Sequence, residues 1–92
     1  MNKCLRITAF GDCTVEILDS FVHKLAQKYE LEGTASIVDN THTVITVCGE
    51  KAMVDSFIDA LHKGTGQWAP DDIEIEPFLK DKDYRGVFRV IK

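Results

Sequence analysis

The spacing of apolar residues changes at Gly11, and this change constrains the fold more than any other feature of the chain. Residues 4–10 alternate between apolar and other side chains, which is the pattern of a half-buried β-strand. From Val15 the apolar residues recur at steps of three and four, which predicts one amphipathic helix as far as about Glu30. The sequence therefore predicts a strand-to-helix junction, where backbone N–H groups and the helix dipole favour an anion.

The rest of the chain contains further segments of strand or helix periodicity, each bounded by Gly, Pro, Asn or Asp. They are strands at 34–38 and 43–48 around a turn at 39–42, a helix at 50–63, strands at 73–76 and 87–91, and a charged turn at 80–83. The order is β-α-β-β-α-β with the last strand split in two. It predicts an α+β fold, a ferredoxin-like βαββαβ sandwich whose antiparallel sheet carries two helices on one face.

Length and charge narrow the classes of function. Ninety-two residues predict a single domain, residues 1–92, with one core. The net charge of −4 disfavours a nucleic-acid or anionic-membrane partner, because both select basic surfaces. No apolar run is long enough to span a membrane.

The cysteines and the N-terminal residues indicate the cellular compartment in which the protein is expected. Cys4, Cys13 and Cys48 form an odd set without CxxC spacing, which favours free thiols in a reducing compartment over a disulfide framework. Cys4 and Cys48 are expected to be buried strand residues. The chain starts directly in a strand without a signal peptide, so the expected location is the cytoplasm.

Several landmarks of the chain resemble those of the acylphosphatase family. Gly11 stands where that family opens its Gly-Arg-Val-Gln-Gly-Val-Gly-Phe-Arg loop, and Gly33 where it begins Gly-x-Val-x-Asn. The stretch 48–50 resembles the Gly-Glu at the start of the family's second helix, and 86–90 resembles its terminal Phe-x-Ile strand. The spacing agrees without gaps from Gly11 to Glu50, and the resemblance covers essentially the whole chain.

The resemblance implies an activity and also its loss. The family hydrolyses acyl phosphates: loop N–H groups surround the phosphate, the arginine neutralises its charge, and the asparagine positions the attacking water. In this chain the arginine position is Asp19 and the asparagine position is Ile37, while loop glycines are replaced by Val15 and Ile17. We therefore expect an early helix start, a reshaped cradle and a pseudoenzyme that acts as a binding or interaction module.

The candidate ligand loop follows from the same comparison. It consists of Gly11, Asp12, Cys13, Thr14, Val15 and Glu16. Thr14 is the expected N-cap of the helix, and Asp19 is expected to be a solvated acid near the positive end of the dipole. No cofactor and no metal are predicted, and the partner is an unknown protein or a small anionic ligand.

Two other functions stay open at this point. The chain could hydrolyse acyl phosphates with non-standard groups, in which case Thr14, Arg6, Lys24 or the loop backbone would supply the anion site. The acidic loop could instead sense a metal ion or a small ligand, although no EF-hand or zinc spacing is present.

The histidines and one face of the sheet are two further candidates for a functional role. Three histidines are expected at the surface without a catalytic triad: His23, His42 and His62. A set of five residues is expected on the sheet face away from the helices, where a protein partner fits better than RNA: Arg6, Thr8, Phe10, Val44 and Thr46.

Overall fold

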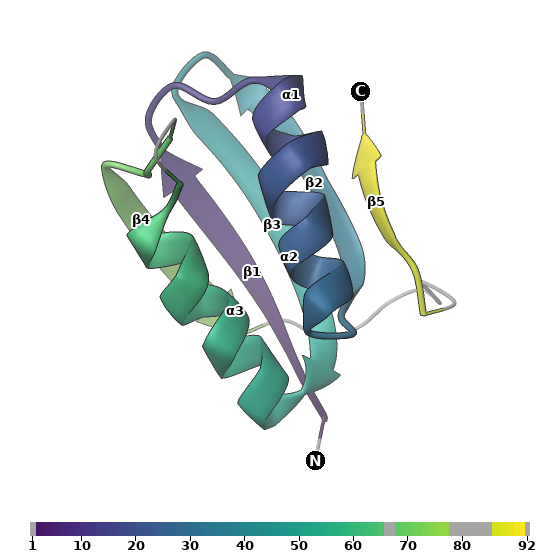
Figure 1. Cartoon of the computed structure of the whole chain (residues 1–92). Coiled ribbons are helices and arrows are strands. Elements are labelled where there is room, and N and C mark those ends of the chain that lie inside the picture. Colours follow the sequence, from purple (N-terminus) through teal and green to yellow (C-terminus); the bar gives the residue numbers. More distant parts are fainter. Residues whose placement is uncertain (1, 66–67, 78–85, 92) are drawn as a thin grey trace.

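A computed structural model describes residues 2–65, 68–77 and 86–91, which form a five-stranded sheet with two helices on one face (Figure 1). The strands are β1 (Asn2–Phe10), β2 (Glu32–Asp39), β3 (His42–Glu50), β4 (Asp72–Pro77) and β5 (Phe88–Ile91). The first helix is continuous through α1 (Val15–Ile17), a π-helical turn η1 (Leu18–Val22) and α2 (His23–Lys28), and the second is α3 (Lys51–Lys63). The charged turn predicted at 80–83 lies outside the described residues.

The sheet order is β4-β1-β3-β2-β5, so the predicted α+β sandwich is confirmed. The neighbouring pairs β4–β1, β1–β3 and β3–β2 are antiparallel, whereas β2 and β5 are parallel. The sheet is therefore mixed, and the predicted antiparallel arrangement holds only for the first three pairs. The reason is that the two parts of the split last strand run beside different partners. β4 lies at one edge beside β1, and β5 lies at the other edge beside β2.

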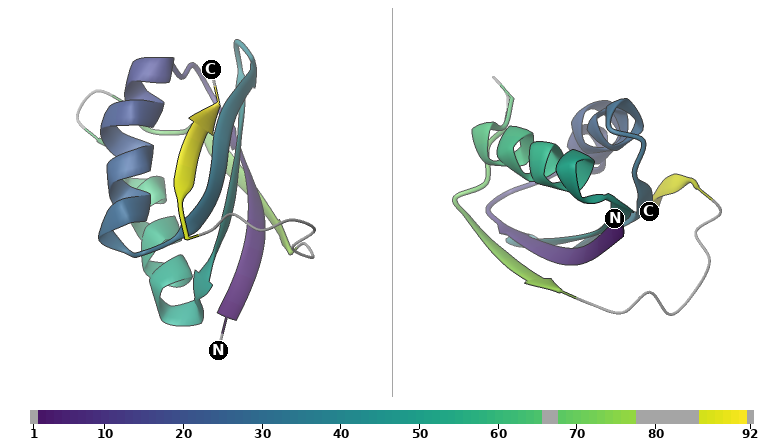
Figure 2. Two further views of the ribbon diagram at one scale, coloured as in Figure 1. Left: turned by 90° about the vertical axis from the view of Figure 1, so that its right-hand side faces the viewer. Right: turned by 90° about the horizontal axis from the view of Figure 1, so that it is seen from below.

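The core lies between the sheet and the helices, which Figure 2 shows on one side of the sheet. Alternate strand residues and one stripe of each helix supply it, as the two periodicities predict. Fully buried members include Ile7, Ile45, Val47, Leu18, Val22, Ala26, Val54, Phe57 and Leu61. Each large side chain of this kind stabilises the fold by about 1.5–3 kcal/mol relative to leaving it exposed.

The first helix ends slightly earlier than predicted, at Lys28 rather than Glu30. The N–H of Leu31 donates to the carbonyl oxygen of Ala26 at 2.9 Å, and the N–H of Glu30 donates to that of Gln27 at 3.1 Å. These two bonds are the Schellman closure of a helix, which requires a left-handed residue. Glu30 supplies it with φ 56°.

Gly33 is required by the close approach of β2 to β3. Its φ is 144°, and a Cβ atom placed there would overlap the carbonyl oxygen of Thr46. Only glycine fits without moving the strand backbone. The family landmark at this position therefore has a steric reason in this fold.

The prediction of free thiols at Cys4 and Cys48 is wrong in this structure. The two residues are register partners on β1 and β3, their Cα atoms are 4.2 Å apart, and they form a disulfide. They are separated by 44 residues along the chain, so their spacing gave no indication of the pairing. Cys13 is the free cysteine.

Within the described residues, no helix is both long enough and apolar enough to cross a membrane.

Candidate functional site

The first helix begins at Val15, and Thr14 is its N-cap as predicted. Thr14 is extended (φ −113°, ψ 161°), and its Oγ1 accepts a hydrogen bond from the N–H of Ile17 at 3.2 Å. Its carbonyl oxygen accepts one from the N–H of Leu18 at 3.1 Å. Two amides of the stretch that would surround a phosphate are therefore bonded within the helix itself.

The start of the loop is bound to the rest of the sheet. Gly11 has φ 122°, and its N–H donates to the carbonyl oxygen of Thr41 at 2.9 Å. The N–H of Asp71 donates to the carbonyl oxygen of Phe10 at 2.7 Å. The loop is thus held between the β2–β3 turn and the segment that enters β4, and the Gly11 amide is also occupied.

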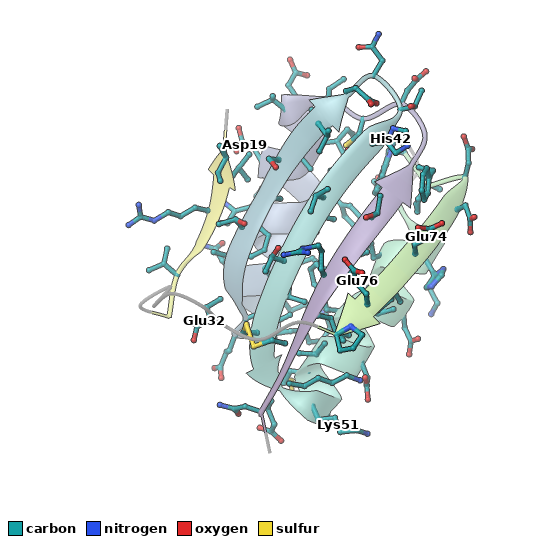
Figure 3. The ribbon with its side chains drawn as sticks, turned by 180° about the vertical axis from the view of Figure 1, so that it is seen from behind. Asp19, Glu32, His42, Lys51, Glu74 and Glu76 are labelled. Atoms are coloured by element: carbon teal, nitrogen blue, oxygen red, sulfur yellow. A yellow bond between two sulfur atoms is a disulfide. The ribbon has the colours of Figure 1, made fainter. Side chains whose placement is uncertain are left out.

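Asp19 lies in the π-helical turn η1, a feature that the sequence reasoning missed. A π turn adds a residue to one helical turn and is frequently found at functional sites. Leu18 and Val22, the first and last residues of this turn, are buried, and Asp19 is half-buried. Figure 3 shows Asp19 at the same end of the molecule as His42. Asp19 lies nearer the β5 edge of the sheet, and His42 lies nearer the β4 edge.

Ile37 is a half-buried residue of β2 that packs against the core. It pairs with Thr43 of β3, and the register shifts between Ile37 and Asp39. The turn η1 contacts β2, so the two replaced family positions come from adjoining elements. Ile37 offers no side-chain donor or acceptor there, as the sequence indicated.

Cys13 is half-buried, and its Sγ lies 3.7 Å from the carbonyl oxygen of Thr14. Burial raises the pKa of the thiol above its ordinary value. A raised pKa disfavours the thiolate, which is the nucleophilic form. Asp12 and Glu16 are exposed beside it.

The three histidines differ more than the surface prediction suggests. His42 Nδ1 lies 2.8 Å from Asp39 Oδ1, and hydrogen bonds from His42 and then from Thr41 lower the pKa of Asp39 to about 2. The ring of His23 stacks on Phe88 at 6.1 Å, beside a hollow of about 400 Å³. His62 is exposed, as predicted. The sequence had no signal for the His23 stack, because Phe88 lies 65 residues away.

The acidic side chains of the loop do not form a metal site. Across residues 2–65, 68–77 and 86–91, no group of three or more His, Cys, Asp or Glu side chains is arranged to hold a metal ion. The stretch 11–19 contains Asp12, Glu16 and Asp19 and no lysine or arginine. The negative charge of this stretch is therefore unfavourable for binding an anion.

The face of the sheet away from the helices is formed as predicted (Figure 3). Arg6 pairs with Thr46, and Thr8 with Val44, across β1 and β3. The disulfide lies on this same face. Arg6 also forms an ion pair with Glu76 of β4 at 3.4 Å. Arg6 is therefore on the opposite side of the sheet from the helix that follows the loop.

Comparisons with known proteins support the fold assignment. No family model and no curated protein match the sequence. The structure is similar to an acylphosphatase from Coxiella burnetii (TM-score 0.85, 25% identity, covering 98% of this chain and 93% of that chain). It is also similar to the acylphosphatase from Bacillus subtilis (TM-score 0.82, 21% identity, all of both chains). A third match is HypF from T. kodakarensis, of which this chain covers 12% (TM-score 0.83, 20% identity). The chain has an acylphosphatase-like fold.

Proposed function

We propose that this acylphosphatase-like domain is non-catalytic and acts as a binding module. The observation that carries the proposal is the chemistry of the two replaced positions, Asp19 and Ile37. An acid replaces the cation that would neutralise phosphate, and an apolar side chain replaces the amide that would position water. At about 4–6 Å, two like charges repel by about 1 kcal/mol in water and by more where water is excluded.

The local backbone supports the same conclusion. The amides of Gly11, Ile17 and Leu18 already have protein acceptors. Preorganised N–H donors aimed at developing charge are the main catalytic resource in phosphoryl chemistry, and losing one such donor costs about 10²–10³ in rate. A loop that has lost both the cation and several of these donors is poorly suited to hydrolysis.

Two of the side chains that an alternative hydrolase would use, Thr14 and Arg6, have other partners. The Thr14 hydroxyl caps the helix, and Arg6 lies on the opposite face of the sheet beside Glu76. Lys24 is exposed on α2. We therefore favour the binding module over the hydrolase with non-standard groups.

Hydrolysis of benzoyl phosphate by the pure protein, corrected for spontaneous decay, tests the proposal. We expect the natural chain to be no faster than a heat-inactivated sample. The double variant Asp19→Arg/Ile37→Asn restores the family residues and is expected to gain activity. The matched control Asp59→Arg/Ile37→Asn makes the same charge change on α3, away from the loop, and is expected to stay inactive.

Turnover by the natural chain above the heat-inactivated sample would overturn the proposal, even if the double variant failed to fold. A second measurement uses amide NMR shifts during titration with inorganic phosphate. We expect the amides of residues 11–19 not to shift at millimolar phosphate. A saturable shift confined to these amides would favour the hydrolase.

A further inference from the structure

β4 is an outer strand of the sheet. One side of it pairs with β1, from Leu5↔Pro77 to Phe10↔Asp72, and no described strand pairs with its other side. An outer strand presents a row of unpaired backbone N–H and C=O groups, which can pair with another extended chain. Figure 1 shows β4 at the edge of the sheet opposite β5.

The side chains of β4 alternate strictly by chemistry. Asp72, Glu74 and Glu76 lie at register positions on the helix-free face, opposite Phe10, Thr8 and Arg6. In Figure 3, Glu74 and Glu76 lie on the near side of the sheet. The intervening positions are isoleucines. The exposed strand thus has one acidic face and one apolar face.

The acidic face is poorly neutralised within the described part of the chain. Glu76 is paired with Arg6 at 3.4 Å, but the two side chains are 64% and 48% exposed, so this pair contributes little. Glu74 has no ion pair among the described residues. Both glutamates border a surface hollow of about 360 Å³, together with Thr8 and Ile75.

We propose that the outer edge of β4 binds an extended cationic segment of a partner protein as an added strand. This inference rests on the proposed role as a binding module, but it uses a surface distinct from the 11–19 loop. Strand addition takes its affinity from main-chain hydrogen bonds and its specificity from alternate side chains. The partner segment would place Lys or Arg opposite Glu74 and Glu76.

Charge selects this occupant over a second copy of the chain. Opposite charges that face each other across neighbouring strands are stabilising, and like charges in the same positions are destabilising. Pairing β4 with β4 of another copy would bring glutamates together, on chains that each carry −4. An alternating cationic and apolar segment instead matches both faces, because its apolar residues lie beside Ile75, which is 43% exposed.

The test uses a fluorescent seven-residue peptide, Lys-Val-Lys-Val-Lys-Val-Lys, titrated with the whole chain and followed by anisotropy. A peptide of the same composition in the order Lys-Lys-Lys-Lys-Val-Val-Val keeps the charge but not the alternation. We expect the alternating peptide to bind at least about tenfold more tightly. We also expect its affinity to fall as salt is raised, because exposed charges are screened.

The protein variants locate the site. Glu74→Lys/Glu76→Lys should weaken binding of the alternating peptide by about tenfold or more, since two attractive pairs become repulsive. The matched control Glu50→Lys/Asp59→Lys makes the same charge change on exposed residues at and within α3, and should bind as the natural chain does. Circular dichroism checks that both variants fold.

Hydrogen exchange gives a readout that charge alone would not produce. We expect the peptide to slow exchange of backbone amides in residues 72–76. Equal binding of the two peptides, equal binding by the β4 variant, or protection elsewhere on the chain would overturn the inference. So would a stable dimer that competes with the peptide. Failure here with an inactive chain in the benzoyl phosphate assay would reject the β4 site alone, whereas an active chain would reject the proposed function.

Discussion

The backbone N–H of Gly11 donates a 2.9 Å hydrogen bond to the carbonyl oxygen of Thr41, and this bond joins the loop after β1 to the β2–β3 turn. The turn has its own support, since Asp39 accepts hydrogen bonds from the Thr41 N–H at 2.8 Å and the Thr41 hydroxyl at 3.1 Å. The His42 ring also forms a hydrogen bond with Asp39. It packs edge-on against the ring of Phe10, with the ring centroids 4.8 Å apart. The shape of the loop therefore depends on the turn.

The carboxyl of Asp39 is expected to control the stability of this turn in acid. Its pKa is lowered to about 2, first by the hydrogen bond from His42 and then by the Thr41 N–H. A folded-state pKa below the usual value of 3.8 means that ionised Asp39 stabilises the fold above about pH 4. This contribution is lost as the pH falls from about 4 to 2. Carboxyl NMR titration measures the pKa directly.

His42→Ala should move the pKa of Asp39 back toward 3.8, because it removes the largest cause of the shift. Asp39→Asn should abolish this part of the acid dependence. Titration of Asp39 at its usual value in the natural chain would contradict the described contacts.

The N-cap is expected to contribute measurably to stability. Thr14→Ala removes the acceptor of the Ile17 N–H and should lower the free energy of unfolding by about 1 kcal/mol. Thr14→Ser keeps the hydroxyl and should leave the free energy of unfolding unchanged or slightly higher, because serine is at least as good an N-cap as threonine. Urea unfolding of the three proteins makes the comparison, and equal losses in both variants would argue against the cap.

Glu30 is expected to be replaceable by glycine with a gain in stability. Its φ of 56° is the left-handed conformation of a helix C′ residue, where a side chain costs roughly 1–2 kcal/mol. Glu30→Gly should therefore raise the melting temperature, despite the larger entropy of glycine in the unfolded chain. Glu30→Ala removes the carboxylate but keeps the Cβ, and it should give no comparable gain. A lower melting temperature for the glycine variant would contradict the Schellman closure.

The thiol count distinguishes the two expectations for the cysteines. In denaturant without reductant, the chain should show one titratable thiol, Cys13, and with reductant it should show three. The bridge closes a separation of 44 residues, so chain entropy gives it about 4 kcal/mol of stabilisation in the simplest account. Three titratable thiols before reduction would contradict the disulfide and support the free thiols that the sequence predicted.

Local signals predicted local structure well. The helix start at Val15, the Thr14 cap and the end of the second helix at Lys63 depend on neighbouring residues, and all three are confirmed. The turn between β2 and β3 follows from Asp39 and Asn40, which tolerate turn conformations. The fold class then follows from the order of these elements.

Long-range features could not be predicted in this way. The disulfide, the His23–Phe88 stack and the placement of β4 and β5 at opposite edges depend on which strands become neighbours. The π turn around Asp19 leaves the apolar spacing of Leu18 and Val22 unchanged, so periodicity does not reveal it. Whether Asp19 and Ile37 abolish hydrolysis stays a prediction.

The sheet order also has a consequence for how the molecule forms. β1 lies between β3 and β4, and Phe10 pairs with His42 on one side and with Asp72 on the other. Pairings between residues so far apart in sequence raise the contact order, and mixed α/β domains fold more slowly than helical bundles, which fold in microseconds to milliseconds. β4 pairs with β1 and with no other described strand. The acidic edge therefore exists only while β4 is paired with β1, a strand from the other end of the sequence.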